Sequence, residues 1–160
     1  MSKDKNKSVI AWLCECPQIK NNPLYFNFIQ AKDNNKQLII NTSEKALERP
    51  YVDGSVLKRY NLTIMDYRSV SFIPVVKDNS KSNENIDEFL DVENIIEWVK
   101  IQENLRNYPD FGDGYLIDSV EAVTGVPTLN GVDTSLTPAL AKYSITIRIN
   151  YLDRTNVLWS

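Results

Sequence analysis

The last part of the chain carries the clearest alternation of apolar and polar positions. From Ala141 to Tyr151 every odd-numbered residue is apolar or aromatic, and every even-numbered residue is polar or charged. Successive side chains of a β-strand point to opposite faces of the sheet, so this unbroken period of two predicts a strand with one buried face. We expect its odd-numbered side chains in the core and its even-numbered side chains on the opposite face.

Shorter runs of the same kind predict further strands upstream. Their approximate bounds are 24–30, 37–41, 59–72 and 115–124. The first two are candidates for a hairpin, because the polar residues 33–36 between them are typical of a turn. The sequence Tyr51-Val52-Asp53-Gly54 predicts a turn before the third run, whereas 42–50 fits no single element.

Two segments have the spacing of amphipathic helices. A long helix is expected over 86–106, with Asn85 as its N-cap, and a short one over 8–16, with Ser8 as its N-cap and Pro17 as its stop. The long helix should lay an apolar stripe on the sheet. That stripe consists of Phe89, Val92, Ile95, Ile96, Trp98 and Val99.

This order of elements predicts an α+β fold. We expect a mostly antiparallel sheet of four to six strands, with one long and one short helix packed on one face. A length of 160 residues is typical of a single domain, here 1–160. Within it we expect a flexible N-terminus at 1–7, extended loops at 77–85 and 125–138, and a C-terminal tail at 153–160.

Composition argues against most catalytic chemistry. The chain has no histidine, which removes the commonest general base and the commonest metal ligand. Cys14 and Cys16 have no second cysteine pair to complete a metal site, so reduced thiols are expected. The net charge of −3 argues mildly against nucleic-acid binding. We therefore expect no enzyme activity, no cofactor and no metal.

The acidic residues leave one alternative open, which is a small carboxylate-dependent enzyme. Such an enzyme, nuclease-like or hydrolytic, would use Asp110, Asp113 and Asp118, although a plain turn is the favoured interpretation of 110–114. The acids of the long helix are expected on a solvated face. They are Glu84, Asp87, Glu88, Asp91, Glu93 and Glu97.

No stretch approaches the length of a membrane span. The lysine-rich start followed by Val9 to Leu13 has too short an apolar run for a signal peptide. A soluble protein that is made and kept in a cytoplasm is the resulting expectation.

Three segments together resemble the tail terminator or minor capsid proteins of tailed bacteriophages. The first is the turn and strand at 51–60. The second is a helix with Leu90, Ile95, Glu97 and Trp98, followed by Gln102 and Pro109, and the third is the alternating run at 141–151. The resemblance covers most of the chain from about residue 50 onward.

The resemblance implies a structural virion protein of a phage tail, made in the cytoplasm of the host bacterium. Such subunits form a hexameric ring that caps the head-proximal end of the tail tube and stops its polymerisation. The implied partners are further copies of the chain, the tail tube protein, and sheath or head–neck proteins, in a contractile tail or a bacteriocin-like particle. DNA would pass through the ring without specific binding, and no membrane is involved. A head–tail connector or other neck protein is the alternative.

A ring subunit needs side surfaces for its neighbours and one surface for the tube. We expect these on the two long loops, on the even face of the last strand and at the terminal tryptophan. The candidate interface residues are Asn79, Lys81, Asn83, Thr128, Asn130, Asp133, Lys142, Arg148 and Trp159.

Overall fold

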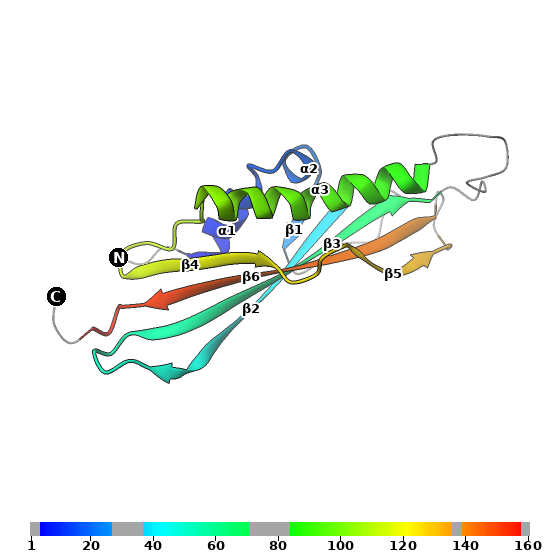
Figure 1. Ribbon diagram of the computed structural model, residues 1–160. Helices are drawn as coiled ribbons and strands as arrows, with labels where there is room; N and C mark the ends of the chain where they lie inside the picture. Colours follow the sequence, from blue (N-terminus) through cyan, green and yellow to red (C-terminus); the bar gives the residue numbers. More distant parts are fainter. Residues whose placement is uncertain (1–3, 27–36, 71–83, 136–138, 158–160) are drawn as a thin grey trace.

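The computed structural model describes residues 4–26, 37–70, 84–135 and 139–157. Within these ranges the chain forms one six-stranded sheet with three helices on one side of it (Figure 1). The helices are α1 (Lys5–Leu13), α2 (Pro17–Lys20) and α3 (Glu84–Leu105). The strands are β1 (Leu24–Phe26), β2 (Gln37–Pro50), β3 (Val56–Ser69), β4 (Tyr115–Ala122), β5 (Thr128–Asp133) and β6 (Leu140–Asp153).

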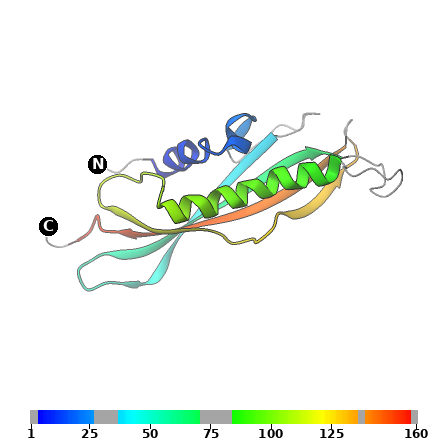
Figure 2. The same cartoon turned by 45° about the horizontal axis from the view of Figure 1, so that its top comes forward.

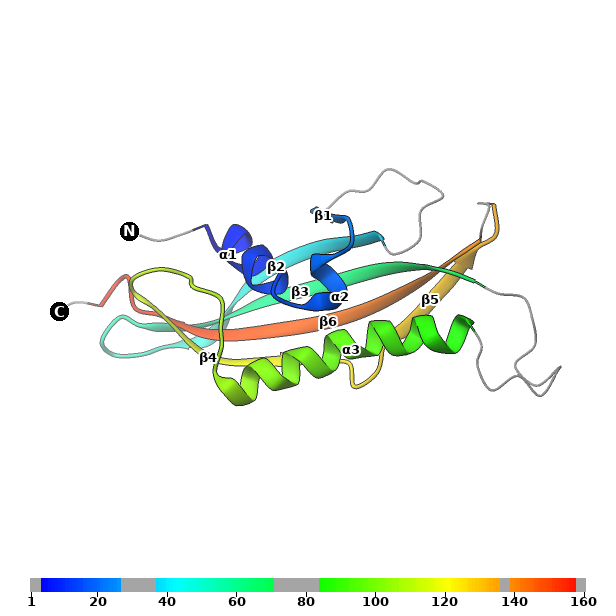
Figure 3. The same cartoon turned by 90° about the horizontal axis from the view of Figure 1, so that it is seen from above.

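The predicted α+β fold class is confirmed. The strand order is β1-β2-β3-β6-β4, and β5 also pairs with β6. Every pair is antiparallel except β1 with β2. Figure 2 shows the helices on the same side of the sheet, and in Figure 3 α1 and α2 lie over the β1–β2 side while α3 lies over the β4 side.

The core lies between the sheet and the helices, where the sequence places it. The odd-numbered side chains of β6 from Ala141 to Tyr151 are buried, and the even-numbered ones are partly exposed. From α3, the side chains of Val92, Ile95, Ile96 and Val99 are fully buried against this face. The buried face that the period of two defines in β6 therefore packs against the apolar face that the helical period defines in α3.

The turn before β3 also forms as predicted, and its glycine has a structural reason. The Tyr51 N–H donates to the Ser55 carbonyl at 2.8 Å, which closes the hairpin between β2 and β3. Gly54 has φ of +95°, and a Cβ there would lie 2.3 Å from the Asn156 carbonyl oxygen. Only glycine fits where the hairpin meets the C-terminal turn at 154–157.

The N-terminal third differs from the sequence-based expectation. The helix N-cap is Asp4, whose carboxylate accepts from the Asn6 and Lys7 N–H groups, so α1 begins before Ser8. It ends at Leu13, and Pro17 opens α2 instead of stopping α1. Proline is favoured at a first helical position because its missing N–H has no intrahelical partner there.

Strands β1 and β2 do not form the expected hairpin. Leu24 pairs with Leu38 in a parallel arrangement, and β2 continues through the ambiguous segment to Pro50. Strand β3 supplies partners along most of this length, and α1 contacts the side chains of Thr42 and Glu44. The Thr42 hydroxyl donates to the Asn6 side chain at 3.3 Å.

The segment 125–138, expected as a loop, contains β5. Strand β5 pairs with the start of β6, with a bulge between Leu129 and Gly131, where Gly131 has φ of +138°. Helix α3 begins at Glu84, so Asn85 lies inside the helix and is not its N-cap. Strand β3 ends at Ser69, and the expected continuations 27–30 and 71–72 and loop 77–83 lie outside the described residues.

Candidate interaction surface

One face of the sheet carries no helix among the described residues, and we call it the open face. It is formed by alternate side chains of the two central strands, all of them partly exposed. From β3 these are Leu57, Arg59, Asn61, Thr63, Met65 and Tyr67, and from β6 they are Lys142, Ser144, Thr146, Arg148, Asn150 and Leu152. The period of two that builds the core on one side therefore builds a polar surface on the other.

The polar groups of the open face bind one another across the strands. The Arg59 Nε donates to Asn150 Oδ1 at 3.1 Å, and Asn150 Nδ2 donates to the Ser119 hydroxyl at 3.0 Å. Arg148 forms an ion pair with Glu121 of β4 at 3.2 Å. The face satisfies many of its polar groups internally, which suits a surface that is exposed to water in the free subunit.

The open face has a positive balance of charge. Arg59, Lys142 and Arg148 lie on it, Glu121 pairs with Arg148, and Asp133 of β5 interacts electrostatically with Lys142. The Lys142 ammonium lies 5.9 Å from the centre of the Tyr67 ring, within cation–π distance. This positive surface occurs in a chain whose net charge is −3.

Helix α3 has a second apolar face that points away from the sheet, which we call the outer stripe. Four of its aliphatic side chains are exposed, and Leu105 exposes 69% of its surface. At 3.6 residues per turn they share an arc of about 100° with two exposed carboxylates. The outer stripe consists of Ile86, Asp87, Leu90, Asn94, Glu97, Ile101, Asn104 and Leu105.

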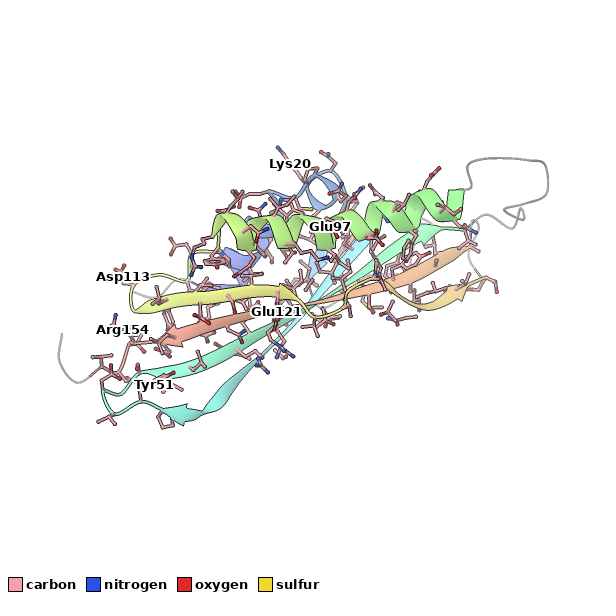
Figure 4. All side chains as sticks on the ribbon, in the orientation of Figure 1. Lys20, Tyr51, Glu97, Asp113, Glu121 and Arg154 are labelled. Atoms are coloured by element: carbon pink, nitrogen blue, oxygen red, sulfur yellow. The ribbon has the colours of Figure 1, made fainter. Side chains whose placement is uncertain are left out.

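The tip of the β2–β3 hairpin is also apolar. Val52 is 99% exposed and Tyr51 is 53% exposed. These two residues, with Asp53, Ser55 and Leu152, line a shallow hollow of about 470 Å³. Tyr51 marks this end of the molecule in Figure 4.

A buried charge cluster lies between β3 and α3, and no local sequence pattern indicates it. Arg68 and Asp66 are both fully buried, and Arg68 donates to the two Asp66 oxygens at 2.8 Å each. The Arg68 guanidinium also donates to Glu88 at 3.1 Å and to Asp91. Glu88 and Asp91 thus bind the sheet, which corrects the expectation that all acids of α3 form a solvated face.

Burial sets the protonation behaviour of this cluster. Desolvation raises the pKa of Asp66 to about 6, although the hydrogen bonds from Arg68 oppose the shift. Desolvation also opposes the charge of Arg68, but its bonds to Asp66 and Asp91 outweigh that cost and raise its pKa. The cluster joins the end of β3 to the first half of α3.

A second carboxylate is shifted in the opposite direction at the far end of the sheet. Partial burial opposes ionisation of Asp153, but hydrogen bonds from Lys58 and Thr155 lower its pKa to about 2. Lys58 Nζ lies 2.8 Å from the Asp153 carboxylate. This pair joins β3 to the end of β6.

The predicted interface residues fall into three groups. Lys142 and Arg148 lie on the open face, as expected. Thr128, Asn130 and Asp133 lie on β5 and not on an extended loop. The remaining candidates, Asn79, Lys81, Asn83 and Trp159, lie outside the described residues.

Asp110, one of the carboxylates considered for catalysis, lies in the turn before β4. Asp110 accepts the Gly112 N–H at 2.9 Å, as expected of a turn. Across 4–26, 37–70, 84–135 and 139–157, no group of three or more cysteines and carboxylates has the geometry of a metal site. Cys14 and Cys16 are free thiols, and burial raises the pKa of Cys16 to about 11, which makes it a poor nucleophile.

None of the described helices combines the length and apolar composition needed to cross a bilayer.

A comparison with protein families finds no family model that matches the chain, and a comparison with curated proteins finds no matching sequence. The structural class is therefore defined by the fold itself, which is a two-layer α+β domain with one polar, uncovered sheet face.

Proposed function

We propose that this chain is a structural subunit of a phage tail or phage-tail-like particle, and specifically a tail terminator. In this role it forms a ring, hexameric by the family resemblance, on the head-proximal end of the tail tube. The ring stops tube polymerisation and offers a docking surface to sheath or head–neck proteins. It has no catalytic role.

The observation that carries the proposal is the pair of unpartnered surfaces on opposite sides of the domain. The open face lies on one side of the sheet, and the outer stripe of α3 lies on the other side (Figure 2). A subunit that contacts neighbours through two different surfaces forms heterologous contacts, which generate rings when the rotation closes.

The chemistry of the described residues supports a structural role over the carboxylate-enzyme alternative. Asp110 is engaged in a turn, and Asp118 lies at the bulge in β4. Three hollows among the described residues are shallow and open. The one at the hairpin tip carries a single carboxylate, Asp53, which binds Ser55.

Co-assembly with the tail tube protein of the same particle tests the proposal. Tube protein is polymerised with and without a saturating amount of this chain, and tube lengths and ends are examined by electron microscopy. A terminator should bind one end as a ring and stop elongation, so the mean length should fall as the chain is added. Tubes that grow equally long with and without the chain would refute the terminator role, and a ring found in the neck would favour a head–tail connector.

A further inference from the structure

We infer that the outer stripe of one copy docks onto the open face of the next copy. This deepens the proposed ring, on which it rests, because it names the two surfaces that neighbouring subunits share. The contact places a helix on a sheet face, which repeats between subunits the packing that α3 already makes on the inner face of its own sheet.

Charge complementarity identifies the occupant of the open face. The open face carries three cations, with Glu121 and Asp133 as the carboxylates beside them, whereas the outer stripe carries Asp87 and Glu97 and no basic residue. Lys100 lies beside the stripe and pairs with Glu97 at 3.1 Å, but both side chains are more than half exposed, so this pair is easily exchanged. A second copy therefore supplies the surface of opposite sign that the open face needs.

The apolar residues of the two surfaces support the same pairing. The outer stripe places four exposed aliphatic side chains along a helix of 22 residues. The open face offers Met65 and Tyr67 towards one end, and Leu57 and Leu152 opposite each other at the other end. Its strands of 14 residues extend over about 46 Å, longer than the roughly 33 Å of the helix. The whole outer stripe thus has room on the open face.

The geometry also makes the contact directional. Because the outer stripe and the open face belong to opposite layers, each copy uses one surface towards one neighbour and the other surface towards the next (Figure 1). The interaction repeats head to tail and closes into a ring when its rotation permits. No two-fold pairing is required.

A charge-exchange experiment tests this contact directly. The sheet-reversed variant carries Arg59→Glu, Lys142→Glu and Arg148→Glu, and the helix-reversed variant carries Asp87→Lys and Glu97→Lys. All five side chains are partly or fully exposed, so both variants should fold, which circular dichroism checks. Arg154→Glu is the control, because this exposed arginine lies in the turn after β6, outside both surfaces (Figure 4).

Self-association is measured by light scattering and sedimentation up to about 1 mM, where a contact with a Kd of about 1 mM is half formed. Each reversed variant alone should associate about tenfold or more weakly than the wild type. An equal mixture of the two should regain assembly, because the acidic sheet of one variant faces the basic helix of the other. The control should behave as the wild type, and added salt should weaken its assembly.

The inference is overturned if either reversed variant alone assembles as well as the wild type, if the mixture stays dissociated, or if the wild type remains monomeric at this concentration. These outcomes are separate from the tube assay. If the wild type caps tubes but the reversed variants still assemble, the terminator role is retained and this contact is rejected. Rescue in the mixture together with uncapped tubes would retain the contact and reject the terminator role.

Discussion

Arg68 provides the most decisive test of how this fold is held together. Its side chain is fully buried and binds Asp66, itself fully buried, through two hydrogen bonds of 2.8 Å. In Arg68→Met the Asp66 carboxylate would keep its burial and lose its cation. Breaking a buried ion pair in this way costs about 3–5 kcal/mol, out of a total stability of about 5–15 kcal/mol for a typical domain. We expect the variant to remain folded, but with a free energy of unfolding close to zero.

The double variant Asp66→Leu with Arg68→Met separates the cost of an unpaired charge from the value of the pair. Apolar replacement of both partners is often neutral or stabilising, so the double variant should lie within about 1 kcal/mol of the wild type. Glu88 and Asp91 also lose the guanidinium, but both side chains retain some exposure and can be hydrated. Urea unfolding followed by circular dichroism measures all the free energies under one set of conditions.

The same series has a pH dependence whose sign is fixed by Asp66. Burial raises its folded-state pKa to about 6, above the value near 3.9 of an unfolded chain. Its contribution to stability is therefore complete below about pH 4 and is lost as the pH rises through 6. Arg68→Met should be destabilised less at pH 5 than at pH 7, because protonation relieves the unpaired charge. A single variant that loses under about 1 kcal/mol at pH 7, or a double variant as unstable as the single one, would refute this reasoning.

Four further predictions use single substitutions. Ile147→Asp should unfold the domain, because it buries a charge at a fully buried site, while Ile147→Val should cost only about 1 kcal/mol; a folded Asp variant by circular dichroism would show that the faces of β6 are misassigned. Tyr151→Phe should raise the urea midpoint by the equivalent of about 1 kcal/mol, since the buried hydroxyl has no hydrogen-bond partner among the described residues, and a lowered midpoint would contradict this. Arg148→Glu should unfold at the same temperature as the wild type within a few degrees but weaken self-association in sedimentation, and unchanged association would count against the open face. The stability that Asp153 contributes is present above about pH 4 and lost as the pH falls towards 2, so Asp153→Asn should flatten the acid limb of the unfolding curve; a limb as steep as that of the wild type would exclude this role.

The sequence predicted those parts of the fold whose signal lies in their own periodicity. The alternation from Ala141 to Tyr151 defined β6 and its buried face, and the apolar spacing in α3 defined the side that covers the sheet. These patterns are long, and each is consistent with one backbone conformation only. The turn at Tyr51–Gly54 was equally readable, because its glycine adopts a positive φ.

Elements whose stability comes from a distant partner were not predicted. Thr128–Asp133 contains an Asn-Gly pair, which locally indicates a turn, yet it becomes β5 because the start of β6 offers it an edge. The segment 42–50 has mixed polarity, and it is a strand because β3 pairs with it. Glu88 and Asp91 looked like solvated helix residues, since nothing near them in sequence indicates that Arg68 lies beneath α3.

Only part of the candidate interaction surface was predicted, because only part of it has a regular local pattern. Lys142 and Arg148 were found because their strand has a regular alternation, whereas the outer stripe was missed. Its aliphatic residues at 86, 90, 101 and 105 are spaced by whole turns, but the apolar residues of the inner face interleave with them. A helix that is apolar on two sides gives a weak amphipathic pattern. That weak pattern was the available sign that α3 has a second apolar face.

The composition of the open face bears on when the subunit assembles. Arg59, Asn150 and Ser119 form hydrogen bonds across the strands, so a free subunit leaves few of these polar groups unsatisfied. Docking a helix there displaces water and breaks up some of these pairs, which keeps a single contact weak. When one subunit is already held at a tube end, each neighbour binds through two surfaces at once, and the effective concentration strengthens both contacts without any new interaction. We therefore expect free subunits to associate weakly and rings to be stable mainly on their template, so that the charge-reversed variants fail at the tube end as well as in solution.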